Sequence, residues 1–374
     1  MKIVHIITTL EEGGAEKSLY NLLLFEKKHS HYVISLKKGG FFYKKFRKAN
    51  IKVFEFDLNN VFKFLMNFFL LFFFIRKINP DVVQTWMYHS NLIGGIIAKL
   101  LGVKKIIWSI RGCYEKKLMS FRTIVVVKLN SILSFYIPDF IIINSNYAKE
   151  SLKQIGFKKN IIQIIHNGFK LNKTKVTQKR KETFYLKHNI SIKTVVFSMV
   201  ARYDNLKDHN TLFQSLRLLK MNNKNILFKC ILVGKNIDNE NKKINYLIDK
   251  YELNNEIILL GNVDDIDFIF SIVDLNILSS LSESFPNVIA ESMLNKTPCI
   301  STKVGDIEEI IGNNGWIVDC KNYQKLYSII LESISLMNKR EKWKDLKNKC
   351  YFHIVKNFEF EKMQKKYLNI WESK

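Results

Sequence analysis

Short apolar runs alternate along the chain with longer stretches in which apolar residues recur at helical spacing. In the first half these runs occupy residues 3–7, 32–35, 53–56, 82–84, 106–110 and 140–144. Strands of a parallel sheet covered by helices on both faces are nearly all apolar, as these runs are. The alternation of strand and helix therefore predicts a doubly wound α/β domain.

The same rhythm starts again after a polar stretch at residues 170–181. The second set of apolar runs occupies residues 194–199, 228–233, 257–260, 275–278, 299–301 and 315–318. We predict two Rossmann-like domains, residues 1–169 and 170–355, with a final helix at about 356–374 that packs back on the first. Each domain would open a crevice at the carboxyl ends of its strands, and the two would face one another across a ligand-binding cleft.

One apolar segment, residues 61–75, has two interpretations. Its longest uncharged stretch, residues 64–75, is shorter than the roughly 20 residues that cross a bilayer. It is either a helix buried against the sheet or an interfacial helix whose aromatic face enters lipid, with Arg76 and Lys77 at the headgroups. Both interpretations exclude a membrane span.

The charge is strongly positive and unevenly placed. The formal net charge is +25, and residues 1–180 hold 31 Lys and Arg against 10 Asp and Glu, a net of +21. Such a domain suits an anionic membrane surface or a phosphorylated acceptor. No nucleic-acid-binding motif is visible, so nucleic acid is not expected as a partner. The five cysteines are scattered, without a CxxC pair, as in a reduced, cytoplasmic protein.

The segment 279–291, SSLSESFPNVIAE, carries the strongest chemical signal. A strand ends in a serine-rich turn, and Pro286 suits the first turn of the helix that follows. The helix start offers backbone N–H groups and a positive dipole end, which suit anions and sugar oxygens. Glu283 in the turn and Glu291 inside the helix can each hold a vicinal diol.

Two further segments add a phosphate-binding character. In residues 197–209, Arg202 and Lys207 follow a strand, and two cations there can clamp a diphosphate without a metal. In residues 8–19, Gly13 and Gly14 open a helix and allow close backbone approach. Asp265-Ile266-Asp267 matches a metal-binding D-x-D pattern, but we interpret it as the acidic start of a helix.

Together these segments resemble the retaining glycosyltransferases of family 4, which have the GT-B fold. The resemblance covers nearly the whole chain and is carried by these motifs: IITTLEEGGAE (6–16), PDVVQTWMYHSNLIGG (80–95), WSIRG (108–112), INSNYAKESLKQIGF (143–157), HNGF (166–169), ARYDNLKDH (201–209) and SESFPNVIAE (282–291). The last is the family's E-x7-E signature.

The resemblance implies Arg202, Lys207 and Glu283 as catalytic residues, the two cations on the donor diphosphate and Glu283 on the donor sugar. Further donor-binding residues implied by it are Glu291, Ser284, Phe285, Pro286, Asn287, Gly13, Gly14 and Val263. Glu291 would hold the ribose, the backbone at 285–287 the sugar, and the backbone at 261–263 the base. Gly13 and Gly14 would sit against the phosphates or the acceptor. Many members place a histidine where this chain has Arg111, so Arg111 and His89 are the acceptor-side candidates.

The expected activity is metal-independent hexose or N-acetylhexosamine transfer with retention, in surface polysaccharide biosynthesis. The donor would be a nucleotide sugar, UDP-linked, with no other cofactor and no metal. The acceptor would be an undecaprenyl-pyrophosphate-linked saccharide at the inner face of the plasma membrane. The alternatives are a GT-B-fold nucleotide-sugar epimerase or hydrolase, and a non-catalytic nucleotide-sugar-binding partner.

Overall fold

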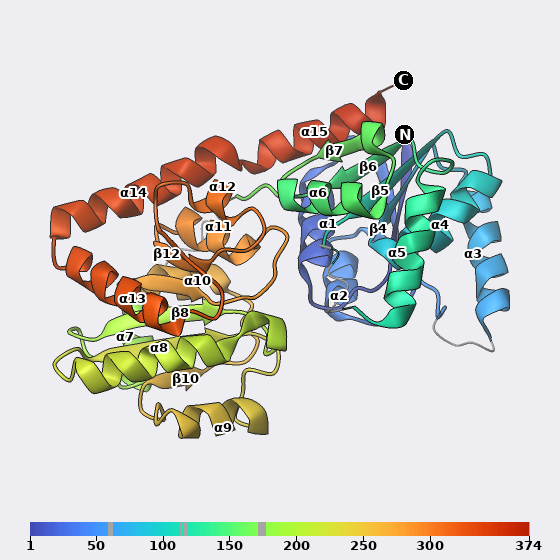
Figure 1. Ribbon diagram of the computed structural model, residues 1–374. Coiled ribbons are helices and arrows are strands. Elements are labelled where there is room, and N and C mark those ends of the chain that lie inside the picture. The colour runs from blue at the N-terminus through green and yellow to red at the C-terminus, as the bar shows by residue number, and fades with distance from the viewer. Residues whose placement is uncertain (59–62, 113, 115–118, 171–176, 374) are drawn as a thin grey trace. The chain divides into compact units, whose positions relative to one another are not determined.

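A computed structural model describes residues 1–58, 63–112, 114, 119–170 and 177–373. The chain forms two compact units, one of residues Met1–Asn167 with Glu361–Lys374 and one of residues Gly168–Phe360. Each unit is a parallel sheet with helices on both of its faces (Figure 1). The predicted α/β class with two doubly wound sheets is confirmed.

The first unit holds a seven-stranded parallel sheet in the order β3-β2-β1-β4-β5-β6-β7. Its strands are β1 (Lys2–Ile7), β2 (Ser30–Ser35), β3 (Lys52–Glu55), β4 (Val82–Trp86), β5 (Lys105–Ile110), β6 (Phe140–Ile143) and β7 (Ile162–Ile164). Its helices are α1 (Gly14–Phe25), α2 (Phe41–Lys48), α3 (Phe64–Ile78), α4 (Tyr88–Leu100), α5 (Phe121–Leu133), α6 (Asn146–Ile155) and, from the end of the chain, α15 (Phe360–Glu372). The six predicted runs of this half all form strands, and the three-residue β7 is an addition at the sheet edge.

The second unit holds a six-stranded parallel sheet in the order β10-β9-β8-β11-β12-β13. Its strands are β8 (Val195–Val200), β9 (Phe228–Val233), β10 (Ile257–Leu259), β11 (Leu275–Leu278), β12 (Cys299–Thr302) and β13 (Trp316–Val318). Its helices are α7 (Gln178–Lys187), α8 (His209–Asn222), α9 (Lys242–Lys250), α10 (Ile266–Ile272), α11 (Asn287–Leu294), α12 (Ile307–Ile311), α13 (Tyr323–Met337) and α14 (Arg340–Asn357). Half of the polar stretch at 170–181, which we interpreted as a linker, lies outside the described residues (171–176), and residues 178–181 form the start of α7.

The apolar helix α3 combines features of both interpretations of its sequence. Leu71, Ile75 and Ile78 are buried in the core of the first unit, whereas Leu65 and Phe73 on another side are 70% and 57% exposed. The predicted segment began at residues 61–62, which lie outside the described residues. Among the described helices, none is long and apolar enough to cross a bilayer.

A buried network of histidines and glutamates ties α15 to the first sheet. His5 on β1 and His31 on β2 share a hydrogen bond of 3.0 Å, and His31 also contacts the carboxylate of Glu26. The other carboxylate oxygen of Glu26 lies 3.2 Å from Nδ1 of His29, whose Nε2 lies 3.3 Å from Glu372 on α15. These contacts depend on protonation, because each imidazole has one acceptor nitrogen only while it is neutral.

This network predicts that the first unit loses stability as the pH falls. Burial lowers the pKa of His5 well below 6.5, and burial also lowers the pKa of His31. Between the folded and unfolded pKa values only the unfolded chain binds these protons, so the stability present above pH 6.5 is lost on acidification. We expect about 1.4 kcal/mol lost through His5 between pH 7.5 and 5.5 and a smaller loss through His31, because the hydrogen bond with Glu26 opposes the lowering of its pKa; both losses would be seen as a lower urea midpoint.

Glu26 adds a second loss at lower pH. Burial alone would raise the pKa of Glu26, but hydrogen bonds from His31 and the Lys28 backbone bring it below 4.5. Its contribution is therefore present above pH 4.5 and lost below it.

The control for the histidine prediction is His5→Gln, which cannot titrate and should lose less stability than the wild type between pH 7.5 and 5.5. Equal losses would contradict the assignment to His5.

Candidate active site

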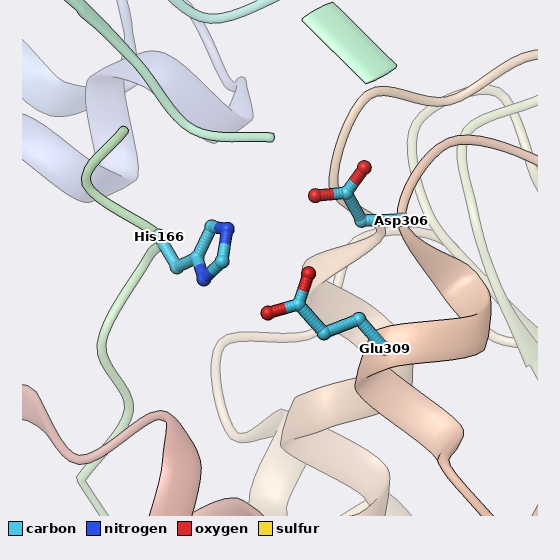
Figure 2. A group of neighbouring side chains, drawn as sticks. All are labelled: His166, Asp306 and Glu309. Atoms are coloured by element: carbon cyan, nitrogen blue, oxygen red, sulfur yellow. The ribbon is translucent and has the colours of Figure 1, made fainter. Parts of the chain in front are cut away.

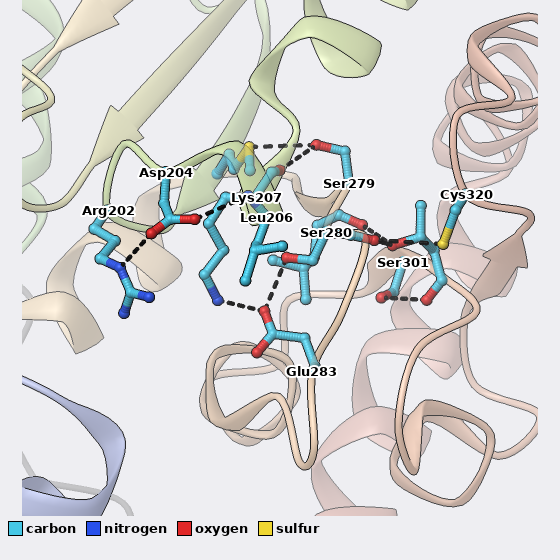
Figure 3. A network of polar contacts seen from close by, with 12 residues as sticks. Arg202, Asp204, Leu206, Lys207, Ser279, Ser280, Glu283, Ser301 and Cys320 are labelled. Carbon is cyan, nitrogen blue, oxygen red and sulfur yellow. Dashed lines mark hydrogen bonds and ion pairs between the residues drawn. The ribbon is translucent and has the colours of Figure 1, made fainter. Parts of the chain in front are cut away.

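Two turns of the second unit bring the predicted donor-site residues together. Strand β8 leads into the turn that carries Arg202 and Lys207, and β11 leads into the turn that carries Glu283. The strands β8 and β11 are neighbours in the sheet, so their carboxyl ends lie side by side. Nζ of Lys207 makes an ion pair with the Glu283 carboxylate (Figure 3).

Several hydrogen bonds fix the two turns against one another. The Ser279 hydroxyl donates to the backbone carbonyls of Lys207 and Asp208 at 3.1 and 2.9 Å. The Leu281 backbone N–H donates to the Leu206 carbonyl at 2.7 Å. The Ser280 hydroxyl donates to Glu283 at 2.8 Å, so this carboxylate is held from two sides. Ser279 and Ser280 therefore fix the backbone and the carboxylate that form the ion pair.

Arg202 differs from Lys207 in how firmly it is held. Its Nε lies 3.3 Å from Asp204, which also caps the short 3-10 helix η4 (Asn205–Lys207) by accepting from the Leu206 N–H at 2.9 Å. The Arg202 side chain is 52% exposed against 17% for Lys207. Figure 3 shows both cationic side chains extending to the same side of the turn. The arrangement offers one fixed and one movable cation for an anionic group.

Two glycines that we did not identify from the sequence each pack closely against the backbone of one of these turns. Gly305, after β12, has φ +51, and a Cβ there would lie 2.3 Å from the Ser284 carbonyl oxygen and 2.6 Å from that of Glu283. Gly234, after β9, has φ +145, and its Cβ would lie 2.8 Å from the backbone nitrogen of Arg202. The positive φ and the missing side chain both require glycine. A glycine one to three residues after each strand was the available sequence signal.

The remaining donor-side candidates surround the start of α11. This helix begins at Asn287, so Pro286 occupies the N-cap position. The sequence had suggested the first turn of the helix for Pro286. The side chains of Ser284 and Phe285 are buried, Phe285 against Phe358 in the core of the unit. Phe285 can therefore offer only its backbone to a ligand. Glu291 is half-buried in the second turn of α11.

The D-x-D sequence is a helix start, as predicted. Asp265 caps α10 by accepting from the Phe268 N–H at 3.1 Å and pairs with Arg180 at 2.7 Å. Asp267 accepts from the Asn295 side chain at 2.8 Å. Both carboxylates thus have structural partners. Val263, close before them, packs partly buried against the core.

Figure 2 draws two more carboxylates, Asp306 and Glu309, with His166 of the first unit. Asp306 precedes α12 and Glu309 lies in its first turn. Among the described residues of the second unit, no third metal-ligating side chain accompanies this pair. Two carboxylates at the start of one short helix do not make a zinc site, which uses three or four protein ligands. We assign them no role.

A polar hollow of about 550 Å³ lies beside the Arg202 turn. Its wall includes three carboxylates, Asp204, Asp238 and Glu240, and a single lysine, Lys243. An acidic wall repels a diphosphate. This hollow is therefore less suited to a diphosphate group than the side of the turn where Lys207 and Glu283 meet.

In the first unit, Gly13 and Gly14 open a helix as predicted. Gly13 is the N-cap of α1, and a Cβ on it would lie 2.4 Å from a carboxylate oxygen of the buried Glu16. This carboxylate thus folds back over the helix start. Because the Glu16 carboxylate already interacts with the positive end of the helix dipole, the start of α1 suits sugar hydroxyls better than a phosphate.

His89 stands in the first turn of α4, after a strained residue. Met87 has φ +75 and ψ 159, a region that non-glycine residues avoid and that costs about 1–3 kcal/mol. Such strain is typical of functional sites. Burial and the nearby Lys37 lower the pKa of His89 below 6.5, so its imidazole is neutral at pH 7. A neutral imidazole can accept a proton or a hydrogen bond from a hydroxyl group.

Arg111, the other acceptor-side candidate, is turned into its own unit. Its Nη1 donates to Asn167 at 2.6 Å, and its guanidinium lies over the rings of Trp86 and Tyr367, 5.0 and 5.8 Å from their centres. Burial lowers the pKa of Arg111 to about 9, so it remains charged at neutral pH. These contacts hold the Arg111 guanidinium between the end of β5 and α15.

Comparison with known proteins agrees with this geometry. The family described as "Glycosyltransferase Family 4" matches residues 12–173, and "Glycosyl transferases group 1" matches residues 180–349. CapM of Staphylococcus aureus, a capsular polysaccharide biosynthesis glycosyltransferase, is 25% identical over 79% of this chain and 76% of its own.

Two further proteins extend the comparison. A Campylobacter jejuni N,N'-diacetylbacillosaminyl-diphospho-undecaprenol alpha-1,3-N-acetylgalactosaminyltransferase is 26% identical over 80% of this chain and 79% of its own. The structure of Anabaena HepE in complex with UDP-glucose superimposes with a TM-score of 0.87 at 19% identity, covering 99% and 98% of the two chains. The chain therefore belongs to the GT-B-fold glycosyltransferases, with a family 4 domain followed by a group 1 domain.

Proposed function

We propose that this glycosyltransferase moves a hexose or N-acetylhexosamine from a UDP-sugar to an undecaprenyl-pyrophosphate-linked saccharide, with retention at the anomeric carbon. It would act at the cytoplasmic face of the plasma membrane, in surface polysaccharide biosynthesis. The observation that carries the proposal is the Lys207–Glu283 pair beside Arg202, at the carboxyl ends of β8 and β11. The Staphylococcus aureus relative acts in capsular polysaccharide biosynthesis and the Campylobacter jejuni relative on a diphospho-undecaprenol-linked sugar, and both support the choice of acceptor.

Lys207 and Arg202 would stabilise the leaving group. As the bond from the sugar to the diphosphate breaks, negative charge grows on the phosphate oxygens, and fixed cations there lower the barrier. Lys207 is held in place before the donor arrives, whereas the exposed Arg202 can close on it. Two cations can supply the neutralisation that a divalent metal gives in other transferases.

Glu283 and Glu291 would hold sugar and ribose hydroxyls. Because Glu283 is already engaged by Lys207 and Ser280, it is poorly placed to attack the anomeric carbon as a nucleophile. Retention would then follow from attack by the acceptor hydroxyl on the leaving-group side, with its proton passing to the departing phosphate. In the first unit, the α1 start and neutral His89 would bind acceptor hydroxyls.

The test is turnover of a panel of UDP-sugars in EDTA, with and without a short polyprenyl-pyrophosphate-linked saccharide. We expect one UDP-sugar to be consumed much faster with acceptor, giving a product whose anomeric proton coupling shows the donor's configuration. Turnover to an epimer or free sugar that the acceptor does not accelerate would indicate the epimerase or hydrolase. Binding without any turnover would indicate a non-catalytic partner, and an EDTA-sensitive reaction would contradict metal independence.

A further inference from the structure

Helix α3 carries apolar side chains on two opposite sides. One side packs on the sheet through Leu71, Ile75 and Ile78. The other exposes five large apolar residues, each more than half exposed: Leu65, Met66, Phe69, Leu70 and Phe73. A surface helix of a water-soluble domain normally turns a polar face outward. The exposed face of α3 therefore suits a non-aqueous surrounding.

Helix α5 presents a second exposed apolar stripe. Phe121, Val125, Leu129 and Ile132 are 80%, 40%, 42% and 61% exposed. Spacings of four, four and three residues place them on one face of the helix. The opposite face buries Val127 and Asn130.

The two helices lie on the same face of the first sheet. Buried residues of α3, α4 and α5 share one core cluster with the strands, and α4 packs against α5. This agrees with right-handed crossovers. The connections that carry α3, α4 and α5 all advance across the sheet in the same direction, towards β6, so their helices lie on the same face. In Figure 1 the three helices stand together at one side of the unit. We call the exposed apolar residues of α3 and α5 the docking surface.

The charge around the docking surface selects its partner. The helices α3, α4 and α5 contain no Asp or Glu, but they carry Arg76, Lys77, Lys99, Arg122 and Lys128. Within these three helices every charged residue is cationic, which matches a bilayer with anionic headgroups. A second copy of this chain, itself strongly basic, lacks this match.

We propose that the docking surface inserts its apolar side chains into the headgroup region of an anionic bilayer. This proposal rests on the proposed function, in which the acceptor is linked to a membrane lipid. It adds the surface of the protein that would contact that membrane. Helices of a parallel α/β sheet begin near the carboxyl ends of the strands, where His89 also lies at the start of α4. Leu65, Met66 and Phe121 are in the first turns of α3 and α5, so lipid would meet this same edge.

The experiment is co-sedimentation of the full chain with phosphatidylglycerol-containing vesicles and with phosphatidylcholine vesicles. We expect binding to the anionic vesicles that weakens with salt. Phe69→Glu/Phe73→Glu and Leu129→Glu/Ile132→Glu should each weaken it about tenfold or more, because charge replaces inserted apolar groups. Arg76→Gln/Lys77→Gln should weaken it about fivefold for each charge removed.

The matched control is Leu186→Glu/Phe352→Glu, which makes the same change at residues of the second unit that are 79% and 65% exposed. Equal loss in this control, or no loss in the α3 and α5 variants with unchanged circular dichroism, overturns the proposal. The proposal is also overturned if the wild type is a dimer that does not bind vesicles and the α3 and α5 variants are monomers. A second copy of the chain would then cover the docking surface.

UDP-sugar turnover in solution separates this proposal from the proposed function. The α3 and α5 variants should retain the wild-type rate of donor hydrolysis without vesicles, because none of their residues belongs to the donor site. If the wild type transfers sugar but does not bind anionic vesicles, the docking surface is wrong and the proposed function stands. Vesicle binding that the variants abolish supports the docking surface even where no UDP-sugar is turned over.

Discussion

Replacing Lys207 with alanine should lower kcat for sugar transfer by about 10²–10³-fold, the loss seen when one preorganised charge-stabilising group is removed. Lys207 is only 17% exposed and is fixed by its ion pair with Glu283, so its ammonium group requires little reorganisation during the reaction. Loss of a group that acts mainly in the transition state reduces kcat more than it raises KM. Steady-state rates at saturating UDP-sugar measure this directly.

A second lysine on the following helix provides the control. Lys220, in the last turn of α8, pairs with Glu256 at 3.0 Å and is one-third exposed. Lys220→Ala removes an ion pair of the same type away from the donor turns and should leave kcat unchanged. A kcat for Lys207→Ala within twofold of the wild type would contradict its role on the leaving diphosphate.

A structural effect of Lys207→Ala can be distinguished by a double variant. Lys207→Ala leaves the Glu283 carboxylate without its cation, and an uncompensated half-buried charge disturbs its surroundings. Adding Glu283→Gln removes that charge. If the double variant regains the wild-type affinity for UDP and still turns over more slowly than Glu283→Gln alone, the loss is catalytic. Recovery of kcat in the double variant would show that Lys207 acts only by supporting the turn.

Much of the fold was predictable because burial on both faces leaves a clear apolar signal. The twelve predicted runs all became strands: nine lie inside the two parallel sheets, and the edge strands β3, β10 and β13 are also rich in apolar residues. The strand β7 was missed because Ile162, Gln163 and Ile164 form a short edge strand with a polar centre. Three residues do not provide a period that distinguishes a strand from a turn.

The contacts of the site were less predictable than its residues. Lys207 and Glu283 were identified separately, but their ion pair joins positions 76 apart and depends on the backbone bond between Leu281 and Leu206. Arg111 was identified as an acceptor-side candidate from its place in the sequence, but only the structure shows its guanidinium over Trp86 and Tyr367, the latter from the end of the chain. Such contacts follow from tertiary packing, which one sequence does not encode locally.

The exposed stripe of α5 shows another limit of sequence reasoning. Leu129 and Ile132 are apolar residues in a helix of a globular domain, and the usual interpretation buries them. Apolar character alone does not state whether protein or lipid removes a residue from water, because both transfers are favourable. Only the structure shows that α5 has one face in the core and another exposed.

Replacing Trp371 with alanine should lower the free energy of unfolding of the first unit by about 3–5 kcal/mol, as for other large buried aromatic residues. Trp371 on α15 is 1% exposed and contacts the rings of His5, His31 and Tyr367. Its indole N–H donates to the buried Gln84 side chain at 2.8 Å, so the variant also leaves a buried acceptor unsatisfied. The measurement is the urea midpoint followed by circular dichroism, with hydrogen exchange of β1 and β4 peptides to assign the loss to this unit.

The control for Trp371→Ala is Lys366→Ala on an exposed position of the same helix, which should leave the midpoint unchanged. Trp371→Phe should fall between the two, because it keeps most of the ring contacts and loses only the bond to Gln84. Lys105 makes hydrogen bonds of 3.0 and 3.1 Å to the carbonyls of Ile370 and Trp371, and these remain in every variant. If Trp371→Ala matched Lys366→Ala, α15 would contribute no stability to the first sheet. A loss seen equally in peptides of β8 and β11 would also contradict the prediction, because Trp371 contributes to the core of the first unit alone.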